Sequence, residues 1–171
     1  QAVPINPIYT AREMTHILDD SDPTVVVFDD ETAAIVEPLL KELSISEGIL
    51  VGGNGGRLLD SWRDDETAKL PEPMPGPDDF ATLQYTGGTT GLPKGVNITH
   101  GQMSVNLSQR EAFLPTRPDD ETVICIMPLF HVFASSMCLH LTAYCRGRLV
   151  ILARYRPDVV LDTIEHENIT R

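Results

Sequence analysis

The order of apolar and polar positions predicts short strands and helices that alternate along the first fifty residues. An uncharged, β-branched run at residues 24–28 and an apolar run at residues 49–51 are typical of buried strands. Apolar residues at helical spacing predict a helix over residues 32–43, although Pro38 disturbs its first half. We also expect a short strand at residues 2–5. This alternation is typical of an α/β fold with mostly parallel sheets flanked by helices.

Capping boxes predict where two helices begin. In a capping box, a threonine and a glutamate or glutamine three residues later each accept a hydrogen bond from the other's backbone amide. Thr10 with Glu13 opens a short helix, and Thr99 with Gln102 opens one that runs to about Phe113. The remaining pattern predicts strands at residues 80–85, 96–98, 123–127 and 148–152, and helices at residues 133–144 and from Pro157 onward.

Residues 123–144 contain no formally charged residue, and a stretch of this length could cross a membrane. However, Pro128, His131, two serines and His140 interrupt the stretch. We therefore interpret it as a strand, a turn and a buried helix.

Charge divides the chain into two parts. Residues 1–84 hold 17 acidic and 5 basic residues, a net charge of −12, whereas residues 85–171 hold 8 of each and are neutral. This balance argues against non-specific binding to nucleic acid or to an anionic membrane. We divide the chain into an acidic α/β segment (residues 1–70), a proline-rich connector (71–79) and a second α/β segment (80–171).

Cysteine and glycine spacing exclude several kinds of site. Three scattered cysteines without a CxxC pair support neither a disulfide framework nor a zinc site, so we expect buried thiols. The glycines at residues 52–56 lack the G-x-G-x-x-G spacing of a dinucleotide-binding turn and read as a plain loop. We interpret the acidic run at residues 119–121 as a solvated turn.

The stretch YTGGTTGLPKGV carries the chemistry. Glycines let backbone amides converge on an anion, threonine hydroxyls can contact phosphate or Mg²⁺, and a lysine adds positive charge. The spacing differs from the usual P-loop, because Pro93 precedes Lys94 and an extended segment follows. We predict a phosphate cradle, and the alternative is a surface hairpin without a ligand. The candidate residues are Tyr85, Thr86, Gly87, Gly88, Thr89, Thr90, Gly91, Leu92, Pro93, Lys94, Gly95 and Val96.

This stretch resembles the signature loop of the adenylate-forming family, which includes acyl-CoA synthetases, coumarate-CoA ligases, luciferases and adenylation domains. Three further segments resemble family motifs in the same order, and together they span nearly the whole chain. They are the PINPIYTARE segment near the N-terminus, THGQ at residues 99–102 and PLFHVF at residues 128–133.

The resemblance implies an ATP-dependent acyl-CoA synthetase. A carboxylate attacks the α-phosphate of ATP, and the thiol of CoA then displaces AMP. It also implies that Lys94 neutralises charge on the phosphates, that Thr86 approaches Mg²⁺, and that His131 lies near the substrate carboxylate. Most members have serine where this chain has Gly87, and the glycine is similar to bacterial long-chain fatty acid–CoA ligases. We therefore expect a fatty acid, with an aromatic or an amino acid as the alternative within the family. A non-enzymatic anion-binding module is the alternative outside it.

The family's later motifs are absent, which leads us to expect a part of the large N-terminal domain of a longer enzyme, inactive by itself and without the C-terminal domain. We expect small-molecule partners, no nucleic acid and a cytoplasmic location. Peripheral contact with the inner face of a membrane stays open for the full-length enzyme.

Overall fold

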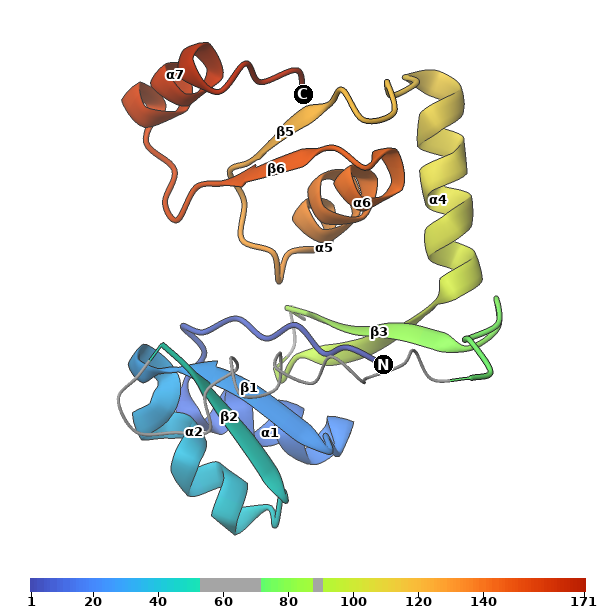
Figure 1. Ribbon diagram of the computed structural model, residues 1–171. Coiled ribbons are helices and arrows are strands. Elements are labelled where there is room, and N and C mark those ends of the chain that lie inside the picture. The colour runs from blue at the N-terminus through green and yellow to red at the C-terminus, as the bar shows by residue number, and fades with distance from the viewer. Residues whose placement is uncertain (53–71, 88–90) are drawn as a thin grey trace. The chain divides into compact units, whose positions relative to one another are not determined.

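The computed structural model describes residues 1–52, 72–87 and 91–171. The fold is α/β, with small sheets and flanking helices, as the sequence predicts. The chain forms two compact units (Figure 1). Unit 1 comprises Gln1–Pro4, Gly76–Gln84 and Asn97–Arg171, and unit 2 comprises Ile5–Pro75 and Tyr85–Val96.

Unit 2 contains the strand–helix–strand repeat predicted for the first fifty residues. Strands β1 (Val25–Asp29) and β2 (Glu47–Val51) pair in parallel, and α2 (Asp30–Glu42) connects them. Helix α1 (Ala11–Ser21) packs against α2 (Figure 1). Their shared core buries apolar side chains from both helices, namely Met14, Leu18, Val36 and Leu39.

Capping side chains fix where the helices of unit 2 begin. Helix α1 starts with the predicted Thr10–Glu13 capping box. Helix α2 starts two residues earlier than predicted, because Asp29 caps it and accepts a 3.0 Å hydrogen bond from the Thr32 backbone N–H. Pro38 lies inside α2 with its side chain exposed, and the helix continues on both sides of it.

Unit 1 is built around the parallel pair β5 (Thr122–Cys125) and β6 (Arg148–Ile151). The helix predicted between them forms, but in three consecutive stretches: α5 (Val132–Ala134), the π-helix η1 (Ser135–His140) and α6 (Leu141–Cys145). A π-helical turn shifts the register of side chains, and such turns are frequent at functional sites.

All three cysteines are buried and free, as predicted, and two of them belong to the core of unit 1. Burial, with a smaller contribution from neighbouring Cys125, raises the pKa of the Cys138 thiol to about 11. The thiol therefore stays protonated at neutral pH and behaves as a small apolar side chain.

The segments around β3 (Phe80–Thr86) and β4 (Lys94–Thr99) follow the prediction closely. The two strands pair, and α4 (His100–Phe113) begins with the predicted Thr99–Gln102 capping box. Helix α7 (Pro157–His166) has proline in its first turn. The expected strand at residues 2–5 is wrong: only Ala2 forms a bridge, to Thr82 of β3. Proline at position 4 has no N–H to extend the ladder.

The interpretation of residues 123–144 as strand, turn and helix is confirmed. Within the described ranges, no helix combines the length and the apolar character that a membrane crossing requires.

Candidate functional site

The predicted phosphate loop lies between β3 and β4, in unit 2. Its two ends are held together weakly, because the Thr86 hydroxyl donates to the Lys94 carbonyl at 3.4 Å. Gly91 has a φ of 143°, a backbone conformation that residues with a Cβ rarely adopt. The predicted residues Gly88, Thr89 and Thr90 lie outside the described residues.

Side-chain burial separates the described loop residues into two groups. Tyr85 and Pro93 are buried, whereas most of the others are exposed, Thr86 and Lys94 among them. In the part of the chain that the structure describes, no hydrogen bond or ion pair engages the Lys94 ammonium. Lys94 thus offers an accessible positive charge directly after the buried Pro93, an arrangement suited to binding an anion.

His131 lies at the end of a tight turn in unit 1. Its backbone N–H donates to the Pro128 carbonyl at 2.9 Å, which closes the turn. Its ring Nδ1 accepts a 3.2 Å hydrogen bond from the Phe133 N–H and so caps α5. A neutral ring in this tautomer carries its proton on Nε2. The exposed ring can therefore donate one hydrogen bond to a ligand while Nδ1 holds its orientation.

Gln84 positions this turn, and sequence reasoning missed it. The Gln84 side-chain amide donates to the Phe130 carbonyl at 2.5 Å, and the Gln84 side chain is buried. Alternate residues of a strand face opposite sides, so its neighbour Tyr85 points the other way from β3. The sequence signal was slight: Gln84 is the one amide side chain in β3, and only the structure shows that it is buried and therefore needs a partner.

A pocket of about 320 Å³ lies in unit 1, and Val132, the residue after His131, is one of the residues that line it. Strands β3 and β4, helix α4 and the α5–η1 helix all contribute to it, and its lining is apolar and uncharged polar. Ser136 donates to Asn106 across it at 2.6 Å. Burial lowers the pKa of His140, so its imidazole is neutral at pH 7. The lining residues are Thr82, Gln84, Ile98, Gln102, Met103, Asn106, Val132, Ser135, Ser136 and His140.

Sequence reasoning also missed this pocket. The chain gave little reason to single out His140, and no motif marks Met103 or Asn106. Their only signal is helical spacing: Met103 and Asn106 are three residues apart, as are Val132 and Ser135. That spacing places each pair on one face of its helix, but it does not say what the face meets.

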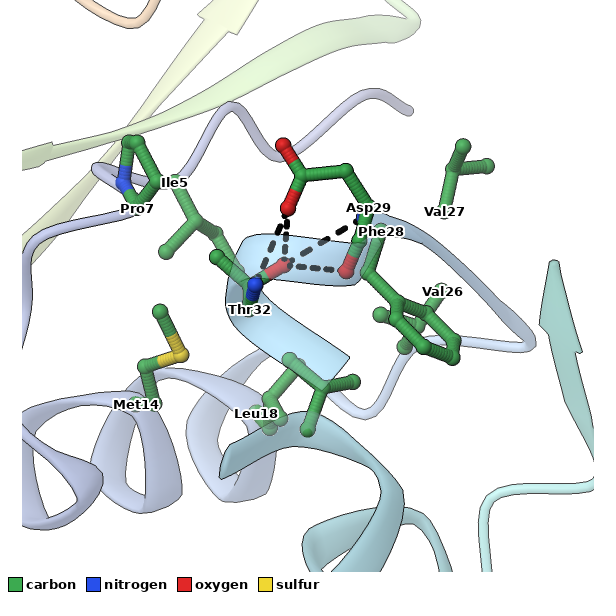
Figure 2. Close-up of a pocket in the computed structure, with 10 residues that line it drawn as sticks. Ile5, Pro7, Met14, Leu18, Val26, Val27, Phe28, Asp29 and Thr32 are labelled. Atoms are coloured by element: carbon green, nitrogen blue, oxygen red, sulfur yellow. Dashed lines mark hydrogen bonds between the residues drawn. The ribbon is translucent and has the colours of Figure 1, made fainter. Parts of the chain in front are cut away.

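A second pocket, of about 200 Å³, lies within unit 2 (Figure 2). Its wall is mostly apolar, with Met14, Leu18 and Phe28 among the lining residues. Its polar groups, Asp29 and Thr32, already bind each other at the start of α2. The hydrogen bonds from Thr32 lower the pKa of Asp29. This pocket therefore offers few convergent polar groups for a ligand.

The acidic run at residues 119–121 differs from the predicted solvated turn. Asp119 and Asp120 are exposed and pair with Arg146 and Arg117, but the Glu121 side chain is 1% exposed. Tertiary contacts, rather than local sequence, bury it. No group of three or more potential metal ligands occurs among the described residues.

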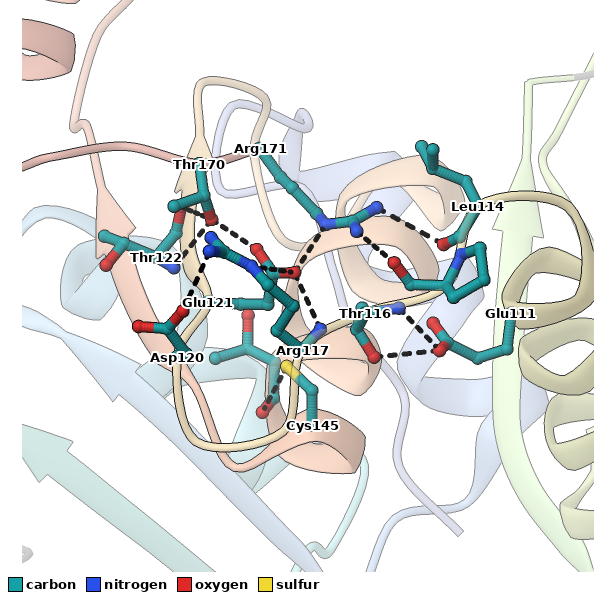
Figure 3. Close-up of polar contacts among 12 residues, drawn as sticks. Glu111, Leu114, Thr116, Arg117, Asp120, Glu121, Thr122, Cys145, Thr170 and Arg171 are labelled. Carbon is teal, nitrogen blue, oxygen red and sulfur yellow. Dashed lines mark hydrogen bonds and ion pairs between the residues drawn. The ribbon is translucent and has the colours of Figure 1, made fainter.

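Glu121 is the centre of a polar network in unit 1 (Figure 3). Its carboxylate accepts hydrogen bonds from the Arg117 N–H at 2.8 Å and from the Thr170 hydroxyl, and it forms an ion pair with Arg171 Nε at 3.1 Å. Burial by itself would raise the pKa of Glu121, but these contacts outweigh it and lower the pKa to about 2. The network joins the loop before β5 to the Thr170–Arg171 segment.

Comparison with known proteins identifies the family. The family model "AMP-binding enzyme" matches residues 1–171, so the chain belongs to the AMP-binding enzyme family. A feruloyl-CoA synthase from Amycolatopsis sp is 32% identical over 169 residues, covering 98% of this chain and 32% of that protein. A long-chain-fatty-acid–CoA ligase from Escherichia coli O157:H7 is 31% identical, covering 80% of this chain and 30% of that protein.

Solved structures agree with this assignment. A long-chain-fatty-acid-CoA ligase (FadD1) from Archaeoglobus fulgidus has a TM-score of 0.85 at 29% identity, over 98% of this chain and 33% of that one. The ATP-bound MatB from Rhodopseudomonas palustris has a TM-score of 0.82 at 25% identity, over 96% of this chain and 32% of that one. The chain thus spans about a third of the length of these relatives.

Proposed function

We propose that the chain is part of an enzyme that uses ATP to activate a carboxylic acid as an acyl-adenylate and then transfers the acyl group to CoA. The observation that carries this proposal is the loop of unit 2, with its accessible Lys94 ammonium and the positive φ of Gly91. A positive charge there would stabilise the negative charge of a leaving pyrophosphate. The family assignment supports the proposal, and a similar solved structure, MatB from Rhodopseudomonas palustris, has ATP bound.

Within this proposal His131 has a separate task. Its Nδ1 is engaged by the Phe133 N–H, so Nε2 would donate to an oxygen of the substrate carboxylate or of the adenylate. The cap on α5 fixes the ring orientation before the substrate arrives. Such preorganisation avoids the cost of ordering the ring during the reaction.

The described part of the loop offers one oxygen ligand that suits Mg²⁺. Thr86 offers one exposed hydroxyl oxygen, whose bond to the Lys94 carbonyl is long. Mg²⁺ is usually held by substrate phosphates and water together with one or two protein oxygens. We therefore propose that Thr86 would contribute one ligand to an ATP-bound Mg²⁺, which would neutralise phosphate charge.

The pocket of unit 1 supports an uncharged acyl or aryl group. None of its ten lining residues is an aspartate, glutamate, lysine or arginine, and His140 is neutral. An amino-acid substrate would bury an ammonium group without a counter-charge there, which is costly. We propose a fatty acid as the substrate. An aromatic acid is the second candidate, favoured by the identity to the feruloyl-CoA synthase.

A substrate panel tests the proposal. Full-length protein would be incubated with ATP, Mg²⁺, CoA and a fatty, an aromatic or an amino acid, and pyrophosphate release would be measured. Release with fatty acids is expected. Met103→Trp, which narrows the pocket, should lower the rate with long substrates more than with short ones, whereas exposed Met74→Trp serves as control. Absence of release with all acids would contradict the enzyme proposal and favour an anion-binding module.

We expect that residues 1–171 alone are not sufficient for enzymatic activity. We propose that it is a piece of the N-terminal domain, divided at the proline-rich connector, and acts in the cytoplasm. Residues 1–171 expressed alone should show no carboxylate-dependent ATP–pyrophosphate exchange. Measurable exchange would contradict the proposal that residues 1–171 need further segments for activity.

A further inference from the structure

Both ends of the loop in unit 2 contact the same helix. The Tyr85 hydroxyl donates a 2.5 Å hydrogen bond to Asp20 Oδ2, and His16 Nε2 lies 2.9 Å from the Pro93 carbonyl oxygen. Asp20 and His16 belong to α1 and are four residues apart. That spacing places their side chains one helical turn apart on the same face.

In each of the two hydrogen bonds, the chemistry of the partners fixes which group donates and which accepts. Tyr85 is 8% exposed, and a buried phenol needs a partner for its hydroxyl. Burial, and then the bond to Asp20, raise the pKa of Tyr85, so the hydroxyl remains a donor at any physiological pH. The Pro93 carbonyl can only accept, so His16 must carry a proton on Nε2.

Helix α1 is a rigid support for these contacts. The Thr10–Glu13 capping box fixes its first turn, with 2.8 Å between the Thr10 N–H and Glu13 Oε2. Its apolar face, which includes the fully buried Ile17, packs into unit 2. Since His16 and Asp20 are not among its buried residues, they are available to hold another segment without disturbing the core.

We propose that His16 and Asp20 are positioning residues that fix the two ends of the phosphate loop on α1. The proposal rests on the proposed function. Backbone amides stabilise developing phosphate charge only when they are held in place before the reaction. Contacts at Tyr85 and at Pro93 hold both ends of the loop on one helix and so limit how far these ends can move apart.

The test uses full-length protein and steady-state pyrophosphate release. In Asp20→Ala and His16→Ala, the KM for ATP should rise about 3- to 10-fold, the effect of one lost hydrogen bond to a positioned segment. The KM values for the carboxylic acid and for CoA should change less than twofold. Asp19→Ala, at an exposed neighbour on α1, is the matched control and should leave all three values unchanged.

Conservative variants separate positioning from folding. Asp20→Asn keeps an acceptor for Tyr85 and His16→Gln keeps an N–H donor for Pro93, so both should recover most of the affinity for ATP. Tyr85→Phe should raise the KM for ATP as much as Asp20→Ala does. The double variant that combines these two substitutions should have no higher KM than either single variant, because all three remove the same hydrogen bond. Additive losses in the double variant would overturn the Tyr85–Asp20 anchor.

Amide hydrogen exchange gives a readout that does not need activity. Exchange in the peptides that contain Tyr85 and Pro93 should be faster in Asp20→Ala and His16→Ala than in the wild type and in Asp19→Ala. Unchanged exchange and an unchanged KM for ATP would overturn the proposal. Lack of pyrophosphate release from the wild type would instead contradict the proposed function, and the exchange result would still decide whether the anchors exist.

Discussion

The Gln84 side-chain amide donates a 2.5 Å hydrogen bond to the Phe130 carbonyl, and this bond joins β3 to the turn that ends in His131. The two residues are 46 positions apart in the sequence. The bond satisfies a buried amide and fixes the residue that precedes the histidine. The orientation of His131 therefore depends on a residue in a distant strand.

Replacement of Gln84 by leucine should remove this hydrogen bond while keeping a side chain of similar volume. The unpaired Phe130 carbonyl would cost about 1–3 kcal/mol of stability, and the displaced turn should raise the KM for the carboxylic acid. Thermal unfolding and pyrophosphate release by the full-length protein measure the two effects. Gln109→Leu, at an exposed position of α4, is the control. An unchanged KM would show that the turn keeps its position without Gln84.

Replacement of His131 by asparagine separates capping from ligand contact. Asparagine is a good N-cap, so stability should stay within about 0.5 kcal/mol of wild type, whereas alanine should cost about 1 kcal/mol. Both variants lose the Nε2–H donor and should lower the rate of adenylation about tenfold or more. Full activity in the asparagine variant would limit His131 to capping α5.

Replacement of Lys94 by alanine should weaken adenylation by about 1–3 kcal/mol, because it removes a charged hydrogen-bond donor from the phosphate site. ATP–pyrophosphate exchange is the appropriate measurement. Lys41→Ala changes the charge equally at an exposed position of α2 and should have no effect. A rate equal to wild type would mean that Lys94 does not contact the transition state.

Replacement of Glu121 by glutamine should change the pH dependence of stability. The contacts lower the pKa of Glu121 to about 2 in the folded state, from an ordinary value of 4.5. A lowered pKa stabilises the folded protein above the unfolded-state value, and this contribution is lost as the pH falls from about 4.5 toward 2. The difference in melting temperature between wild type and Glu121→Gln should therefore be largest above pH 5 and shrink in acid. A difference independent of pH would show that ionisation of Glu121 does not matter.

The sequence predicted much of the local structure, for identifiable reasons. Capping boxes such as Thr10–Glu13 and Thr99–Gln102 act over three residues, β5 is an uncharged run, and β1 is one except for its last residue. These signals are local, so they depend little on the rest of the fold. The expected strand at residues 2–5 failed because pairing depends on a partner strand and on N–H groups that proline lacks.

The sequence by itself determined that this is an α/β chain carrying a glycine- and threonine-rich loop with one lysine, because glycine freedom and lysine charge are properties of single residues. Only the tertiary structure decided what holds that loop and what surrounds the histidine. The Tyr85–Asp20 bond spans 65 positions, and Glu121 meets Thr170 across 49. Such pairings follow from the folding of the whole chain, which brings distant polar groups together. Burying a polar group without a hydrogen-bond partner costs free energy, so buried polar groups are usually paired.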